Sequence, residues 1–132
     1  MDDYKRLGDF FARYPELYYS KGSVILNGGD TNNRVYYLSS GVVKEYSVST
    51  GGDVFIIHMY HPGTFFPIFV FENHLTEIDY FETVTPCRIK TASMSDFSVF
   101  LTGSHEILKE FTRRLLNSTY LITRRLGVLA GG

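Results

Sequence analysis

Hydrophobic residues in the first part of the chain recur at helical spacing. Five of them lie three or four positions apart, so they share one face of a helix. They are Leu7, Phe10, Phe11, Tyr14 and Leu17. Proline disfavours helical geometry in the residue before it, so Pro15 is predicted to end the first helix. Residues 1–20 are therefore predicted to form a helical lead-in.

The pattern then changes to short runs of β-branched and aromatic residues, separated by turn signals. The predicted strands cover residues 24–26, 35–38, 42–46, 54–57, 80–85 and 88–92. Short strands that follow one another closely are typical of a small antiparallel β-barrel or jelly roll. We place this barrel at residues 21–92. The expected fold class is mainly β with flanking α: the barrel, an N-terminal helix and a long C-terminal helix.

Helical spacing returns after the last predicted strand. A serine hydroxyl can accept a hydrogen bond from an otherwise unpaired N–H group at a helix start. Ser95 is therefore predicted to cap a short helix, which Gly103 ends. Ser104 can cap the next helix, which meets no glycine or proline until after Leu126. The C-terminal helices are expected over residues 95–126.

The last predicted helix carries an imperfect heptad pattern. Its predicted seam consists of Leu108, Phe111, Leu115, Ser118 and Ile122. Hydrophobic residues seven apart are typical of a coiled coil, but Ser118 and Arg125 stand where a regular seam has apolar side chains. An amphipathic stripe alone does not choose its partner, so the helix packs either on its own barrel or against a second copy. We expect the second arrangement, which gives a homodimer.

Composition narrows the class of protein. The 132 residues fall within the usual size of one domain, and 44% hydrophobic residues with 16% aromatics are enough for a core. The net charge of −1 excludes a globally basic nucleic-acid coat. A single cysteine, Cys87, excludes a disulfide framework and cysteine-rich zinc or iron–sulfur sites.

The sequence shows no targeting or membrane segment. No apolar run reaches the roughly 18–20 residues that a membrane helix needs. The first three residues, Met1-Asp2-Asp3, are acidic where a signal peptide is basic. The sequence therefore predicts a soluble, cytoplasmic protein.

Several short motifs occur in a characteristic order. They are Lys21–Leu26, Gly29-Asp30, Tyr36–Lys44, Gly52-Asp53 and His61-Pro62-Gly63. Their glycines mark tight turns, where a positive φ costs glycine least. Taken in order, the motifs resemble the N-terminal sensor of Crp–Fnr transcription regulators, which is a cyclic-nucleotide-binding-type domain. The resemblance extends over residues 20–126.

This resemblance implies a sensor that dimerises through its long helix and holds a small ligand inside the barrel near that helix. In such regulators a following helix-turn-helix domain then changes its position on DNA. This chain stops at Gly131-Gly132, where that second domain would begin. We therefore expect contact with DNA only through a domain that is absent from this chain, and no enzymatic activity.

The resemblance also implies a ligand-binding cassette after the Pro-Gly turn. Nucleotide-binding members carry a Gly-Glu pair there, which meets phosphate and ribose, and an arginine that neutralises the cyclic phosphate. The equivalent positions here are Pro67, Ile68 and, within a residue or two, Glu77. No Lys or Arg occurs in residues 45–87. Because an unpaired phosphate is costly to bury, we expect cyclic AMP and cyclic GMP not to bind in the family's usual way.

The same stretch suits an apolar or aromatic effector. The candidate ligand contacts are Phe65, Phe66, Pro67, Ile68, Glu77 and Tyr80, together with Ser118 and Thr119 of the long helix. The two hydroxyls fall near the helix hydroxyls that meet the base in the family. Aromatic walls hold flat ligands by stacking, but the same rings also form ordinary barrel cores.

Two other functions stay open from the sequence. A barrel filled by its own side chains would be a stand-alone interaction module. Alternatively, His58, His61, Glu72 and His74 suggest a cupin-like metalloprotein, because His and Glu are common metal ligands. Residues three apart in a strand face opposite sides, which disfavours the first two histidines as joint ligands. We therefore expect no metal ion and no cofactor.

Overall fold

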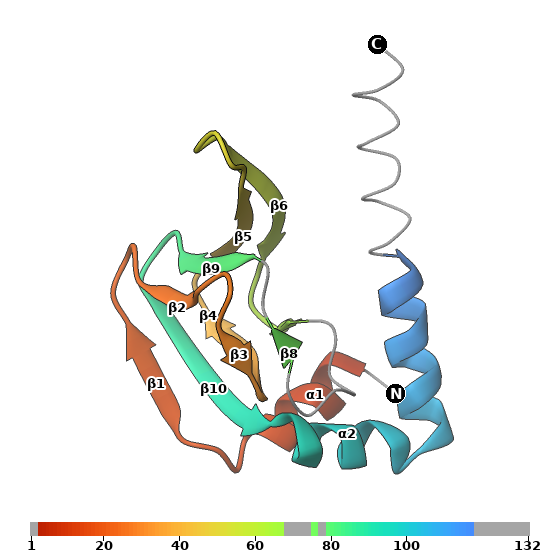
Figure 1. The fold of residues 1–132 in the computed structure, drawn as a ribbon. Helices are drawn as coiled ribbons and strands as arrows, with labels where there is room; N and C mark the ends of the chain where they lie inside the picture. Colours follow the sequence, from red (N-terminus) through yellow and green to blue (C-terminus); the bar gives the residue numbers. More distant parts are fainter. Residues whose placement is uncertain (1–2, 68–74, 77–78, 118–132) are drawn as a thin grey trace. The chain divides into compact units, whose positions relative to one another are not determined.

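The computed structural model describes residues 3–67, 75–76 and 79–117 (Figure 1). The chain divides into two compact units, residues 1–98 and residues 99–132. The first unit holds every described strand and helix α1 (Asp3–Phe11). Helix α2 (Met94–Thr102) begins in the first unit and ends in the second. None of the described helices is long and apolar enough to cross a membrane.

The first helix is shorter than predicted, and a strand follows it. Helix α1 ends at Phe11, and strand β1 (Glu16–Tyr19) pairs with strand β10 (Cys87–Ser93). The prediction of helix up to residue 20 is therefore wrong for residues 16–19. Leu17 matches the helical spacing of the preceding residues, yet its side chain is 41% exposed. The backbone ladder to β10, and not burial of Leu17, fixes this segment as a strand.

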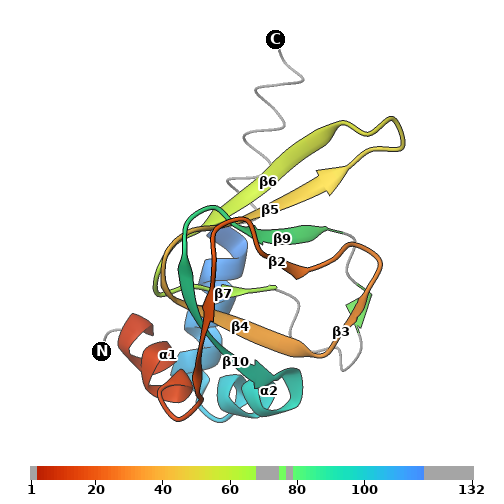
Figure 2. The ribbon, with the colours of Figure 1, turned by 90° about the vertical axis from the view of Figure 1, so that its left-hand side faces the viewer.

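Two four-stranded antiparallel sheets make up most of the first unit (Figure 2). The β1 sheet has the order β1-β10-β4-β7, with β4 at Arg34–Ser40 and β7 at Phe65–Phe66. The β6 sheet has the order β2-β9-β5-β6. Its strands are β2 (Val24–Leu26), β9 (Tyr80–Thr83), β5 (Val43–Val48) and β6 (Val54–Tyr60). A small third sheet pairs β3 (Thr31–Asn32) with β8 (Leu75–Thr76).

The predicted fold class is confirmed: antiparallel sheets with an N-terminal helix and C-terminal helices. All six runs predicted as strands are strands, although β9 ends at Thr83, two residues before the predicted end. The Thr83 hydroxyl donates a hydrogen bond to the Ser20 carbonyl at 2.8 Å and accepts one from the Ser23 N–H group at 2.8 Å. This buried side chain ties the turn before β2 to the end of β9.

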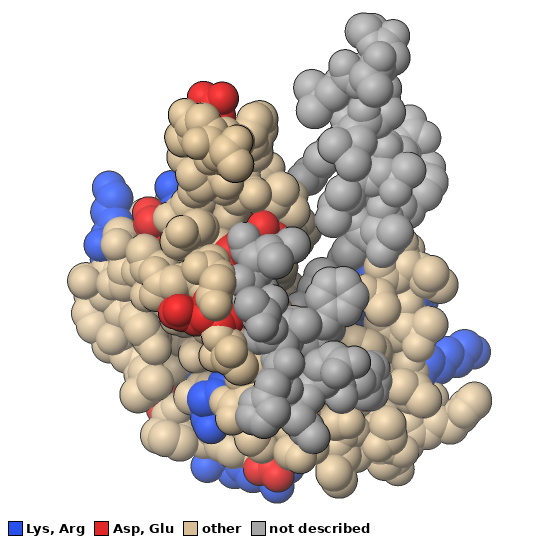
Figure 3. Space-filling view, viewed as in Figure 1, with Lys and Arg blue, Asp and Glu red and all other residues tan. Residues whose placement is uncertain are grey.

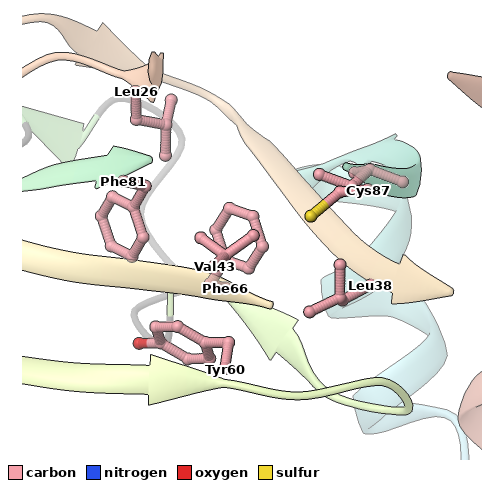
Figure 4. Packing of buried hydrophobic residues seen from close by; sticks show 8 residues of the cluster. Leu26, Leu38, Val43, Tyr60, Phe66, Phe81 and Cys87 are labelled. Carbon is pink, nitrogen blue, oxygen red and sulfur yellow. The ribbon is translucent and has the colours of Figure 1, made fainter. Parts of the chain in front are cut away.

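The two large sheets share a core of aromatic and aliphatic side chains (Figure 4). Its buried members are Leu26, Leu38, Val43, Tyr60, Phe66, Phe81, Cys87 and Ile89. The ring of Phe66 stacks on Phe81 at a centroid distance of 5.2 Å and on Tyr36 at 5.5 Å. Because Phe66 is 0% exposed and Phe81 is 1% exposed, these stacked rings fill the barrel at this level.

A second aromatic cluster covers the opposite face of the β1 sheet. Phe11 of α1 stacks on Tyr37 of β4 at a centroid distance of 5.0 Å. The Phe11 ring also lies 5.5 Å from the ring of Phe97 in α2. Val35 and Ala92 are opposite each other on β4 and β10, and both are fully buried. The N-terminal helix therefore gives this face of the sheet its own hydrophobic layer.

The cap of α2 differs from the prediction by two residues. The Ser93 hydroxyl accepts a hydrogen bond from the Asp96 N–H group at 3.0 Å, so Ser93 and not Ser95 caps the helix. The helix begins at Met94 because the last residue of β10 already supplies the capping oxygen. Gly103 ends α2 as predicted, and residues 105–117 are again helical. The predicted continuation to residue 126 lies outside the described residues.

Candidate functional site

Phe65 and Phe66, two of the predicted ligand contacts, lie on opposite sides of strand β7. The Phe66 ring is in the barrel core, whereas the Phe65 ring meets Phe97 of α2 at 4.9 Å in an edge-to-face contact. Consecutive residues in a strand face opposite ways, so one ligand inside the barrel cannot contact both rings. Pro67 follows Phe66 through a cis peptide bond and is buried.

Tyr80 also lies apart from Phe66. Its ring stacks on Tyr46 of β5 at 5.2 Å, with the rings within 9° of parallel. The next residue, Phe81, faces the core, so Tyr80 lies on the outer face of the β6 sheet. The Tyr46 hydroxyl donates to Glu82 at 3.1 Å, and burial together with this hydrogen bond raises the pKa of Tyr46. The other predicted ligand contacts, Ile68, Glu77, Ser118 and Thr119, lie outside the described residues.

A carboxylate inside the barrel is the feature that the sequence analysis missed. Glu45 pairs with Phe81 on β9 and with His58 on β6, and cross-strand partners share one face of a sheet. Glu45 is therefore on the inner face. Its carboxylate accepts a hydrogen bond of 2.7 Å from the hydroxyl of Tyr60, whose ring packs against Phe66. The sequence alone does not give this orientation, because Val42 and Val43 are both apolar. Once Val43 is placed in the core, a residue two positions later shares its face.

The lysine of the β6 sheet lies on its outer face. Lys44 of β5 is opposite Glu82 on the outer face of the β6 sheet, with 3.6 Å between Nζ and Oε2. In the β1 sheet the exposed Arg34 shares the inner face of β4 with Tyr36 and donates to the Thr91 hydroxyl at 2.9 Å. The exposed Arg88 pairs with Glu16 at 3.5 Å. Within the described strands of the β6 sheet, the inner face therefore presents the carboxylate of Glu45 and no lysine or arginine.

The family model for the cyclic nucleotide-binding domain matches residues 16–104. The chain belongs to this family. The match begins at the first residue of β1, a strand within the predicted helical lead-in, so the domain includes that strand. No functionally curated protein matches the sequence.

Solved structures with the same fold as this cyclic nucleotide-binding domain include three regulators. The c-di-GMP-responsive global regulator CLP of Xanthomonas campestris is 19% identical, with a TM-score of 0.78 over 96% of this chain and 64% of that chain. A transcriptional regulator of Thermotoga maritima is 19% identical, with a TM-score of 0.80 over 100% of both chains. The catabolite activator protein of Thermus thermophilus is 15% identical, with a TM-score of 0.76 over 96% of this chain and 59% of that one.

These likenesses establish the fold of the domain. At 15–19% identity they do not transfer a ligand or a partner. The domain spans less than two thirds of the CLP and catabolite activator chains that it matches. The activities and partners of those whole proteins are therefore not assigned to this domain by the likeness alone.

The predicted dimer seam of the domain is partly described. In the helical residues 105–117, Phe111 is 6% exposed and Leu108 and Leu115 are half-buried. They occupy one face of the helix, while Leu116 next to them is 64% exposed. Ser118 and Ile122 lie outside the described residues. In the described part of the helix, the residues at heptad spacing thus form one face that is partly or fully buried.

The two candidate metal ligands that the structure describes, His58 and His61, lie on different elements. His58 lies on the inner face of β6, and His61 is exposed in the turn that follows β6. Glu72 and His74 lie outside the described residues. Among the residues that the structure does describe, no three His, Cys, Asp or Glu side chains come together. Cys87 is buried in the core, and burial raises the pKa of its thiol.

Proposed function

We propose that this domain is the effector-sensing and dimerisation part of a Crp–Fnr-like transcription regulator. The family match and the three regulators of the same fold support this proposal. Contact with DNA would then be made by a domain outside this chain. The effector would be a small apolar or aromatic molecule, because the inner face of the barrel is lined by aromatic rings.

Glu45 is the observation that carries the choice of effector. Its carboxylate lies on the inner face of the barrel, where the described strands of its own sheet, β2, β9, β5 and β6, supply no cation. A phosphate brought beside it would meet a like charge at low dielectric, and an unpaired buried anion costs several kcal/mol. Loss of the family's Gly-Glu pair at Pro67 and Ile68 acts in the same direction.

Isothermal titration calorimetry is expected to give no saturable heat with cyclic AMP or cyclic GMP up to millimolar concentration. The Glu45→Gln variant removes the charge but keeps an acceptor for the Tyr60 hydroxyl. Weak binding that appears only in this variant would assign part of the exclusion to the carboxylate. A micromolar dissociation constant for the unaltered protein would contradict the proposal.

A thermal-shift screen with uncharged aromatic compounds tests the sensing function directly. A ligand present at about 100 times its dissociation constant stabilises the folded state by about 2.7 kcal/mol. For a domain of this size that shift raises the melting temperature by several degrees. A set of anionic aromatic compounds of matched size serves as the control and is expected to give no shift.

Association through the helix 105–117 is the second part of the proposal. Leu115→Glu is expected to weaken association by about 100-fold, because it places an unpaired charge in an apolar contact. The adjacent Leu116→Glu is the matched control, since Leu116 is 64% exposed and lies off the heptad seam. Light scattering after size exclusion should show half the native mass for the first variant alone. Equal masses for the native protein and both variants would refute pairing through this seam.

One observation favours a second candidate, a stand-alone interaction module. Phe66 and Phe81 are almost completely buried by each other and by their neighbours, so this layer of the barrel is already filled. A module of this kind would keep its association through the helix but give no shift with any class of compound. The screen and the mass measurement together therefore separate the two functions.

A further inference from the structure

The hairpin of β5 and β6 exposes an unusual amount of apolar surface. Val54, Phe55 and Ile56 are consecutive, and their side chains are 58%, 56% and 60% exposed. Figure 2 shows β5 and β6 continuing as a hairpin beyond the neighbouring strand β9. Monomeric proteins tolerate single exposed apolar residues, but a contiguous exposed group marks an interaction surface.

Both faces of the hairpin contribute to this surface. Val54 pairs with Val48 and Ile56 pairs with Tyr46, so these four side chains lie on the outer face of the β6 sheet. Phe55 points to the other face, because it stands between Val54 and Ile56 in the strand. An antiparallel sheet with one solvated face usually has polar residues there. In the outer part of this hairpin, at the pairs Val48–Val54 and Tyr46–Ile56, the solvated face is aliphatic and aromatic.

Strand β6 is also an edge strand. It ends the order β2-β9-β5-β6, so among the described strands β5 pairs with it on one side and none pairs on the other. Natural proteins protect such edges with lysine, proline or an inward charge. Residues 54–57 contain none of these. By contrast, β1 at the edge of the other sheet carries Glu16, which pairs with Arg88.

The charge distribution restricts what can cover this edge. No Lys or Arg occurs in residues 45–61, and the acidic Asp53 stands at the turn before β6. Figure 3 shows the hairpin as uncharged surface with an acidic group at its tip. Nucleic acid and anionic membranes need positive charge, so neither fits. The surface suits an apolar, uncharged protein strand.

We propose that β6 pairs with β6 of a second copy of this chain, antiparallel about a two-fold axis at Phe55. In this register Val54 of each copy lies opposite Ile56 of the other, and the two Phe55 rings meet on the opposite face. An antiparallel pair is symmetric about such an axis, so one strand is complementary to itself. Since residues 54–57 carry no charge, two copies meet without repulsion. The open edge N–H and C=O groups gain partners.

This contact uses elements different from the helix 105–117. The proposal therefore stands whether or not that helix also pairs, and the two are tested by different variants. In either case, breaking the β6 contact is expected to lower the mass of the native species.

Disulfide trapping tests the register. Residues directly opposite in an antiparallel pair have Cα atoms about 4.5–5.5 Å apart, within the range that a disulfide spans. Phe55→Cys is expected to form a covalent dimer about tenfold faster than Tyr18→Cys, because pairing holds the two thiols at high local concentration. Tyr18 is the matched control, since it is 68% exposed on the other edge strand, β1. The native Cys87 is buried and does not compete.

Light scattering supplies the second measurement. Ile56→Lys places a charge on the edge and is expected to halve the mass of the native protein, whereas Tyr18→Lys leaves the mass unchanged. Circular dichroism on both variants confirms that the fold is kept. Equal trapping rates for Phe55→Cys and Tyr18→Cys, with no change of mass in Ile56→Lys, would overturn the proposal.

Discussion

Replacing Phe66 by alanine is expected to cost about 3–5 kcal/mol of unfolding free energy, the usual range for removing a buried phenylalanine. The ring is 0% exposed and stacks on both Tyr36 and Phe81. Neighbours held in two sheets cannot collapse into the space, so a cavity remains. Small domains are stable by about 5–15 kcal/mol, and this one substitution would remove a large share.

Chemical unfolding followed by circular dichroism measures this effect. Phe66→Leu keeps an apolar side chain in the core and is expected to lose clearly less than the alanine variant. Tyr18→Ala is the surface control, because Tyr18 is 68% exposed and its loss should stay within about 0.5 kcal/mol. A Phe66→Ala protein as stable as the control would mean that the stacked layer contributes little to the fold.

Gly41→Ala is expected to destabilise the domain by about 2–5 kcal/mol. Gly41 has a φ of 94°, a conformation that costs other residues about 1–2 kcal/mol. A Cβ atom added there would also lie 2.5 Å from the Pro86 carbonyl oxygen and 2.6 Å from the Cys87 sulfur. Relieving that overlap moves the backbone and adds about 1–3 kcal/mol.

Gly52→Ala separates the two contributions. Gly52 has a similar φ of 89°, but nothing lies within 4 Å of a Cβ atom added there. The Gly52→Ala variant should therefore lose only the free energy needed to hold alanine at a positive φ, about 1–2 kcal/mol. Comparable unfolding midpoints for the two alanine variants would rule out the close approach of residues 85–87 as a cause.

The sequence predicts most of this fold because the pattern is local. Each longer strand has a run of β-branched or aromatic residues, and glycine turns separate the runs. The misses have local causes too. Leu17 fits a helical face and a strand equally well, and only pairing with β10 decides between them. β3, β7 and β8 are two residues long, too short to show any alternation.

The candidate site is harder to predict than the fold. Phe65 and Phe66 are adjacent, and no pattern in two residues tells which one faces the barrel. Glu45 faces inward because it is two residues after the inward-facing Val43. Which residues of β5 face inward is known only from its pairing with β9 and β6. Residues 54–57 resemble a buried strand in composition, yet three of them are exposed. Burial of a side chain depends on which other elements pack against its strand, and the sequence of that strand alone does not show this.

The two-residue strand β7 joins the two hydrophobic layers of the first unit. Phe66 belongs to the layer inside the barrel, and Phe65 touches Phe97 at the start of α2. A single peptide bond separates them, and close-packed interiors transmit small displacements because they have little free volume. We therefore expect a molecule that displaces the Phe66 ring to shift the contact between Phe65 and Phe97 as well. Strand β7 would then couple the interior of the barrel to the start of α2.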